Sequence, residues 1–211
     1  MNFLQVALTT KCNLSCEYCP IVKWRNVAPK FPLCNEELIP FVEKWCVPEL
    51  WVIELTGGEP ALYDGLPELL AWLSNTGYTT LVKTNGMLPI AKYPKTRRCA
   101  AFHNIERPPL YFDLYLIIND EKAKDKIAYC TANMIPYRLI GRDNVPLRGQ
   151  THYFEKCAFI NPAGHQVPCQ AITPVTDERD GHDFLRITDR PLVLGDCCPT
   201  CKAALDAWRF L

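Results

Sequence analysis

Short apolar segments alternate with amphipathic segments along the first two thirds of the chain. The segments with strand character are residues 2–9, 51–55, 79–83, 111–118 and 137–140. Apolar residues at helical spacing predict helices over residues 35–45, 66–73 and 120–133. We expect Asn35 to cap the first of these helices. Residues 86–110 are poorly patterned and predict no regular element.

This alternation predicts an α/β fold with parallel strands and right-handed crossovers. A complete eight-unit barrel typically needs about 250 residues, whereas the β/α pattern of this chain ends near residue 150. We therefore expect a partial TIM-like barrel of five or six β/α units over residues 1–150. A small cysteine-rich domain is expected over residues 151–211, after the pattern changes between residues 144 and 151.

Composition limits the classes of partner. The 211 residues include 23 basic and 23 acidic side chains, so there is no net field to attract a polyanion, and nucleic acid is unsupported but not excluded. The N-terminus lacks the basic and apolar regions of a signal peptide, and no apolar run has the length of a membrane span. We expect a cytoplasmic protein with no membrane partner. In such a protein the 12 cysteines are better explained as metal ligands than as disulfides.

Three of the cysteines, Cys12, Cys16 and Cys19, lie in a C-x3-C-x2-C loop directly after the first predicted strand. Three soft thiolate ligands at this spacing indicate an iron–sulfur cluster. A four-iron cluster takes four ligands, so one iron would keep a position open for a molecule that is not protein, as in an open catalytic metal site.

A second motif, Gly57-Gly58-Glu59-Pro60, follows the second predicted strand. A plain turn would explain the two glycines but would not require Glu59 and Pro60. Together with the cysteine loop, this motif resembles the radical S-adenosylmethionine (radical SAM) superfamily. The resemblance implies a partial barrel in which S-adenosylmethionine binds the open iron of a 4Fe-4S cluster. There it is reductively cleaved to a 5'-deoxyadenosyl radical that removes a hydrogen atom from the substrate.

The resemblance also implies roles for individual residues. Tyr18 should lie beside the adenine, and Gly57, Gly58 and Glu59 should receive the methionine amino group. Thr84 and Asn85 end the third strand in a Thr-Asn-Gly run, which indicates either a cofactor contact or a simple turn.

Two further cofactor contacts are expected after later strands. The family often has Ser-x-Asp where the fourth strand meets the ribose, and here Asn119 or Asp120 would serve, although Asp120 could equally cap a helix. Arg138 or Arg142 could bind the methionine carboxylate with a planar guanidinium. No catalytic side chain is assigned.

The C-terminal region contains a second group of cysteines. Its predicted ligands are Cys157, Cys169, Cys198 and Cys201, with Cys197 competing with Cys198 for one position. This arrangement resembles the short Twitch version of the SPASM extension, which implies an auxiliary 4Fe-4S cluster and hence two clusters in the protein. Structural zinc and ordinary buried thiols are the alternatives. The remaining cysteines without ligand spacing are expected to be small buried side chains, namely Cys34, Cys46, Cys99 and Cys130.

The predicted function is that of a radical SAM enzyme acting on a small-molecule or nucleotide substrate by oxidation or rearrangement. The auxiliary cluster would accept an electron or anchor the substrate, and the resemblance implies a flavodoxin- or ferredoxin-type electron donor. Peptide modification is the alternative within the family. A non-enzymatic electron carrier or zinc module is the alternative of another class, but such a protein has no need for the Gly57–Pro60 motif.

Overall fold

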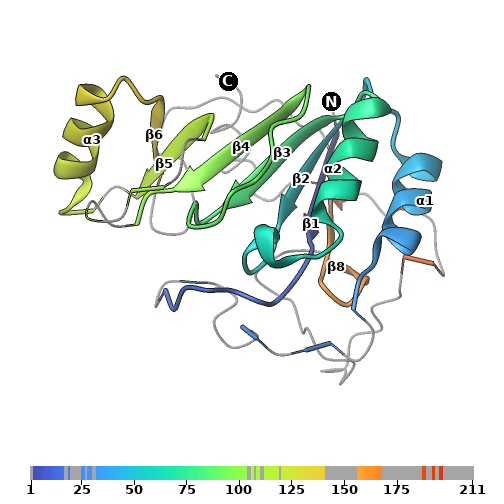
Figure 1. The fold of residues 1–211 in the computed structure, drawn as a ribbon. Coiled ribbons are helices and arrows are strands. Elements are labelled where there is room, and N and C mark those ends of the chain that lie inside the picture. The colour runs from blue at the N-terminus through green and yellow to red at the C-terminus, as the bar shows by residue number, and fades with distance from the viewer. Residues whose placement is uncertain are drawn as a thin grey trace.

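We describe the protein from a computed structural model, drawn as a ribbon in Figure 1. The structure describes residues 2–16, 19, 25–26, 28–29, 32–103, 106, 108–109, 112–118, 120–140, 156–167, 187–188, 192 and 195–196. Within these ranges, no helix combines the length and the apolar character that crossing a membrane requires.

Seven parallel strands form one open sheet in the order β6-β5-β4-β3-β2-β1-β7. Their bounds are β1 Asn2–Ala7, β2 Trp51–Thr56, β3 Thr79–Thr84, β4 Thr96–Ala101, β5 Leu114–Ile118, β6 Tyr137–Ile140 and β7 Lys156–Ile160. Each of the first six strands lies beside the one before it in the chain, as in a barrel, but the sheet does not close. The predicted α/β partial barrel is therefore confirmed.

Two helices cover one face of the sheet at β1, β2 and β3 (Figure 1). They are α1, Asn35–Trp45, and α2, Leu66–Asn75, and their apolar side chains pack against strand residues such as Leu4 and Ile53. The third helix, α3, Ala123–Ala132, lies at the far end of the sheet beside β5 and β6 (Figure 1). A short 3-10 helix, η2, Pro60–Leu62, follows β2.

Asn35 does not cap α1, contrary to our expectation. The cap position belongs to Cys34, and Asn35 is the buried first residue of the helix. Its amide nitrogen donates to the carbonyl oxygen of Gly65 (2.9 Å) and to the Glu68 carboxylate (3.0 Å), and its amide oxygen accepts from the Tyr63 hydroxyl (2.9 Å). The side chain is thus used to join α1 to the start of α2, which a sequence pattern does not reveal.

Strand β4 falls within residues 86–110, where we expected no element, and that expectation was wrong. Its sequence, Thr-Arg-Arg-Cys-Ala-Ala, lacks an apolar alternation. The strand forms nevertheless, because Arg98 has partners outside it. Arg98 donates to Asp113 (3.1 Å) and to the carbonyl oxygen of Ile90 (2.8 Å), and its guanidinium lies 5.5 Å from the centroid of the Phe112 ring. These contacts add to the apolar packing of Cys99 and Ala100, which are both fully buried.

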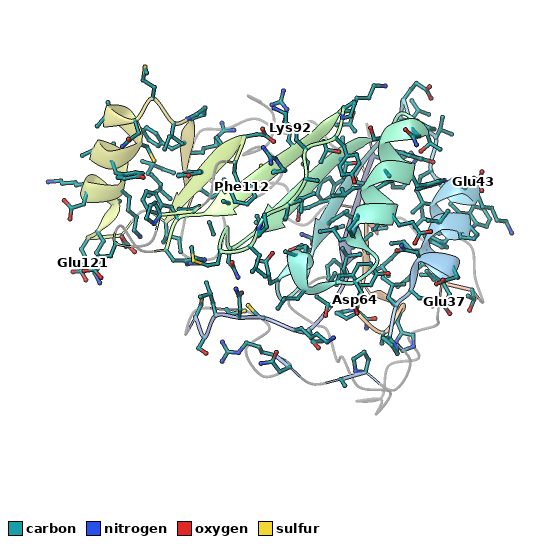
Figure 2. All side chains as sticks on the ribbon, in the orientation of Figure 1. Glu37, Glu43, Asp64, Lys92, Phe112 and Glu121 are labelled. Atoms are coloured by element: carbon teal, nitrogen blue, oxygen red, sulfur yellow. The ribbon has the colours of Figure 1, made fainter. Side chains whose placement is uncertain are left out.

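Loop side chains, and not a helix, accompany β4. Residues 85–95, all of which the structure describes, connect β3 to β4 without a helix. Figure 2 shows Lys92 and Phe112 over this part of the sheet, and Lys92 lies 3.2 Å from the Asp113 carboxylate. Burial raises the pKa of Asp113, but hydrogen bonds from Arg98 and Lys92 outweigh it and hold the pKa below its usual value, so the carboxylate stays charged.

The sheet also continues past residue 150. β7 pairs in parallel with β1, and two short strands, β8 Gln166–Val167 and β9 Gly195–Asp196, pair with β7 in antiparallel fashion. Part of the cysteine-rich region thus extends the barrel sheet. Most of that region lies outside the described residues, so the domain division at residue 150 stays a prediction.

Candidate active site

The cysteine loop begins where β1 ends, at the edge of the sheet toward which the strand arrows in Figure 1 point. Backbone and side-chain bonds fix the loop in place. Asn26 accepts the N–H of Cys12 through its side-chain oxygen (3.1 Å), and its own N–H donates to Thr10 (3.0 Å). A turn brings the Cys19 N–H to the carbonyl oxygen of Cys16 (3.3 Å). The three thiols are all half-buried.

The Gly57–Glu59 turn is hydrogen-bonded directly to the backbone of this loop. Gly58 N–H donates to the carbonyl oxygen of Thr9 (2.6 Å), and Glu59 N–H donates to that of Lys11 (2.7 Å). A β-carbon at Gly57 would lie 2.6 Å from the Thr9 oxygen, and one at Gly58 would lie 2.1 Å from the Lys11 oxygen. Both glycines are therefore required for the close approach of the two motifs.

Glu59 is fully enclosed, with 0% of its surface exposed. One carboxylate oxygen accepts from the Ala61 N–H (3.0 Å) and from the Thr84 hydroxyl (2.7 Å), and the other accepts from the Asn85 N–H (2.8 Å). This side chain caps η2 and joins the end of β2 to the end of β3. The structure thus shows a positioning function for Glu59 that the sequence did not predict.

Thr84 and Asn85 lie where sequence analysis expected them, at the end of β3, and both are buried. Asn85 reaches the cysteine loop: its amide nitrogen donates to the side-chain oxygen of Asn13 (2.6 Å) and lies 3.9 Å from the sulfur of Cys12. The structure therefore brings together Gly57, Gly58, Glu59, Thr84 and Asn85 with the loop that carries Cys12, Cys16 and Cys19.

Asp120 follows β5 and contacts residues that lie close to it in the sequence. One oxygen accepts from the Lys122 N–H (2.9 Å), and the other lies 4.0 Å from the Lys126 ammonium. A ribose contact was expected at the end of the fourth strand, and the strand before Asp120 was counted as the fourth. Because β4 precedes it, that strand is the fifth, β5, and the fourth strand ends at Ala101. A ribose contact for Asp120 stays a prediction on a weakened premise.

The remaining predicted site residues are not brought to the loop by any described contact. Arg138 lies on β6, which β5, β4 and β3 separate from β2. Of Cys157 only the backbone is described, on β7. Predicted residues that lie outside the described ranges are Tyr18, Asn119, Arg142, Cys169, Cys197, Cys198 and Cys201.

Three of the cysteines without ligand spacing are buried, as predicted: Cys46, Cys99 and Cys130. Burial raises the pKa of the Cys46 thiol to about 12, and burial also raises the pKa of Cys99 and Cys130. These groups stay neutral thiols at physiological pH and are poor metal ligands. Cys34 is only half-buried, at the start of α1.

Sequence analysis missed a group of polar side chains within the strands. Strand register places Gln5, Glu54 and Arg97 in one row across β1, β2 and β4, and the apolar Leu81 of β3 lies between Glu54 and Arg97. Alternation directs this row to the face opposite the one that packs against α1 and α2. Gln5 donates to Glu54, which is only 1% exposed. Lys83 lies on the same face. The signal available in the sequence was a carboxylate inside the otherwise buried strand Trp-Val-Ile-Glu-Leu-Thr.

The donor set of the loop fits an iron–sulfur cluster. Three thiols from one fixed loop are half-buried, and the Cys12 sulfur accepts the N–H of Leu14 (3.5 Å). Among the described residues, no three ligating side chains converge on a single ion. A four-iron cluster instead takes one cysteine at each iron.

Comparisons with known proteins agree with this geometry. No protein-family model matches the chain. It is 28% identical over 165 residues to the mitochondrial GTP 3',8-cyclase of Arabidopsis thaliana, and this alignment covers 75% of this chain and 42% of that protein. It is 38% identical over 79 residues to 7-carboxy-7-deazaguanine synthase of Methanothermobacter thermautotrophicus, and this alignment covers 37% of this chain and 31% of that protein. The chain thus spans less than half the length of these relatives.

Among solved structures, Streptococcus suis SuiB bound to S-adenosylmethionine has a TM-score of 0.55 at 12% identity, covering 89% of this chain and 61% of that chain. SuiB bound to its precursor peptide SuiA has a TM-score of 0.53 at 13% identity, covering 80% and 59%. The fold is that of the radical SAM partial barrels. The homologues of this chain are radical SAM enzymes, which confirms the resemblance found in its sequence.

The backbone contact between the Gly57–Glu59 turn and the cysteine loop leads to a prediction for Gly58→Ala. Because the added β-carbon would lie 2.1 Å from the Lys11 oxygen, the turn and the loop must separate, which we expect to cost about 3 kcal/mol of unfolding free energy. Urea unfolding measures this loss, and iron content after anaerobic reconstitution should fall at the same time.

Gly77→Ala is the matched control for this prediction. Gly77 has a φ of +89° but an open surrounding, with its nearest neighbour at 3.5 Å. It should lose about 1 kcal/mol from backbone strain alone and keep its iron. Wild-type iron content and stability in Gly58→Ala would show that the cysteine loop does not depend on its contact with this turn.

Proposed function

We propose that Cys12, Cys16 and Cys19 bind a 4Fe-4S cluster and that the chain uses S-adenosylmethionine to remove a hydrogen atom from its substrate. The observation that carries the proposal is the direct bonding of the Gly57–Glu59 turn to the cysteine loop, which places the two motifs side by side. When bound, the cluster and S-adenosylmethionine supply the 5'-deoxyadenosyl radical chemistry. A flavodoxin- or ferredoxin-type protein in the cytoplasm is the proposed source of electrons.

The protein side chains bind and orient in this proposal. Gly57, Gly58 and Glu59 form the proposed site for the methionine amino group, with Tyr18 at the adenine. Thr84 and Asn85 hold the carboxylate of Glu59 in a fixed position beside the loop. Asp120 and Arg138 remain proposed contacts for the ribose and the methionine carboxylate.

We further propose that the substrate binds against the sheet face that carries Glu54, Lys83 and Arg97. This face lies opposite the helices α1 and α2, and its charged groups lie within strands, where apolar residues are the rule. A small molecule or nucleotide is the proposed substrate, because relatives include a GTP 3',8-cyclase and a 7-carboxy-7-deazaguanine synthase. Oxidation and rearrangement are both open.

Peptide modification is the second candidate. SuiB, which shares the fold, has been solved with its precursor peptide. Since the identity is 13%, that likeness concerns the fold. Competition of purine nucleotides and peptides for formation of 5'-deoxyadenosine would separate the two candidates.

An auxiliary cluster held by Cys157, Cys169, Cys198 and Cys201 completes the proposal. Strand pairing supports it: the backbone of Cys157 on β7 lies opposite Gly195 on β9, and the Cys197–Cys198 pair follows β9 directly in the chain. The zinc alternative uses the same ligands.

The first test of the function uses Cys16→Ala. Anaerobically purified wild-type protein with sodium dithionite should convert S-adenosylmethionine to 5'-deoxyadenosine and methionine. The variant should show no such cleavage, because the cluster loses one of its three ligands. Cys130→Ala, which removes a buried thiol on α3, serves as the control and should cleave normally. Wild-type cleavage by reconstituted Cys16→Ala would overturn the assignment of this loop.

Glu59→Gln tests the carboxylate. The glutamine must present an NH2 group to at least one of three donors, so unfolding free energy should fall by about 1 to 3 kcal/mol. Loss of the charge should also weaken S-adenosylmethionine binding by about 10- to 100-fold in calorimetry. Glu68→Gln alters a carboxylate that accepts one hydrogen bond from Asn35 and should leave binding unchanged. Lost stability with wild-type affinity would limit Glu59 to a structural function.

Metal analysis tests the auxiliary cluster. The wild-type protein should hold about eight irons, four in each cluster, and a variant that lacks the three loop cysteines should keep about four. Mössbauer spectroscopy of that variant should show one four-iron cluster and no stoichiometric zinc. Zinc without iron would overturn the auxiliary cluster and leave the radical SAM function intact. Comparing Cys197→Ala with Cys198→Ala identifies the fourth ligand.

A further inference from the structure

The amide of Asn85 connects the end of β3 to the first cysteine of the loop. Its nitrogen donates to the Asn13 side-chain oxygen (2.6 Å) and lies 3.9 Å from the Cys12 sulfur, within reach of an N–H···S bond. The Cys12 sulfur also accepts the Leu14 N–H (3.5 Å). Cys12 therefore has one donor from its own loop and one from the segment that follows β3.

The position of this amide is fixed on every side. The Asn85 side-chain oxygen accepts the Met87 N–H (3.0 Å), and its backbone N–H donates to Glu59 (2.8 Å). With 7% of its surface exposed, the side chain has little freedom to rotate. Both amide hydrogens consequently point toward the cysteine loop, at Asn13 and Cys12.

A donor aimed at a ligand sulfur acts on the charge of a cluster. One-electron reduction adds negative charge to the cluster and its thiolates, and an N–H···S bond stabilises that charge more in the reduced state than in the oxidised state. Donors outside the ligand set adjust metal sites in this way. We propose that Asn85 is a positioning residue for Cys12 that raises the reduction potential of the loop cluster, an inference that rests on the function proposed above.

The test is an EPR-monitored titration of the loop cluster with sodium dithionite, in protein from which any C-terminal cluster has been removed by Cys198→Ala and Cys201→Ala. Asn85→Ser is the main variant. Its hydroxyl can still accept the Met87 N–H and its backbone can still bond to Glu59, but it is too short to reach the sulfur. At a fixed potential the ratio of reduced to oxidised cluster should fall about tenfold, equivalent to about 59 mV for a one-electron couple.

Thr84→Val is the matched control. It removes a hydroxyl that donates to Glu59 (2.7 Å) from the neighbouring position, but this hydroxyl has no described contact with a cysteine sulfur. A merely structural effect would change the potential of both variants alike, whereas a sulfur contact affects Asn85→Ser alone. Asn85→Leu, which removes every polar contact of the side chain, should shift the ratio at least as far as Asn85→Ser.

Three outcomes would overturn the inference. An unchanged potential in Asn85→Ser would show that the amide does not act on the sulfur. Equal shifts in Asn85→Ser and Thr84→Val would make the effect structural. Loss of the cluster in Asn85→Ser, with retention in Thr84→Val, would replace tuning by a need for the amide in assembly. Absence of a loop cluster from the wild-type protein would instead refute the proposed function.

Discussion

The backbone contact between the Gly57–Glu59 turn and the cysteine loop is the constraint on which the site depends. Two N–H groups of the turn donate to carbonyl oxygens of the loop, at 2.6 and 2.7 Å, and no side chain larger than hydrogen fits at the two glycines. The enclosed carboxylate of Glu59 then connects this pair of segments to Thr84 and Asn85. Three strand ends are thereby locked to one another, so the position of the thiols follows from the sheet.

Parallel strand order explains why these segments meet. β1, β2 and β3 are adjacent and point the same way, and therefore the segments that follow them emerge at one edge of the sheet. Helices α1 and α2 occupy one face, which leaves the other face to Glu54, Lys83 and Arg97. These three residues lie on β2, β3 and β4, next to β1, which leads into the cysteine loop.

The part of the sheet around β4 is covered by loop side chains. Between β3 and β4 the chain crosses without a helix, and the ion pair of Arg98 with Asp113, beside Lys92 and Phe112, covers the strand. A partly buried ion pair costs desolvation, which its several hydrogen bonds offset. Toward the other end of the sheet, β7 carries the first predicted auxiliary ligand, Cys157, next to the strand β1 that leads into the loop. Cys157 is therefore separated from the cysteine loop by one strand pairing.

The sequence by itself showed the resemblance to radical SAM proteins, the cysteine loop, the Gly57–Pro60 motif and the alternation of strands and helices, because ligand spacing and apolar period are local properties of the chain. It did not reveal β4, where Arg98 finds its partners in the loops before and after the strand, nor the true use of Asn35, whose partners are about 30 residues away. Only the tertiary structure showed that Glu59 is enclosed and that Asn85 reaches Cys12 across 73 positions of sequence. Such contacts depend on strand register and on the crossing of separate segments, which no local pattern encodes.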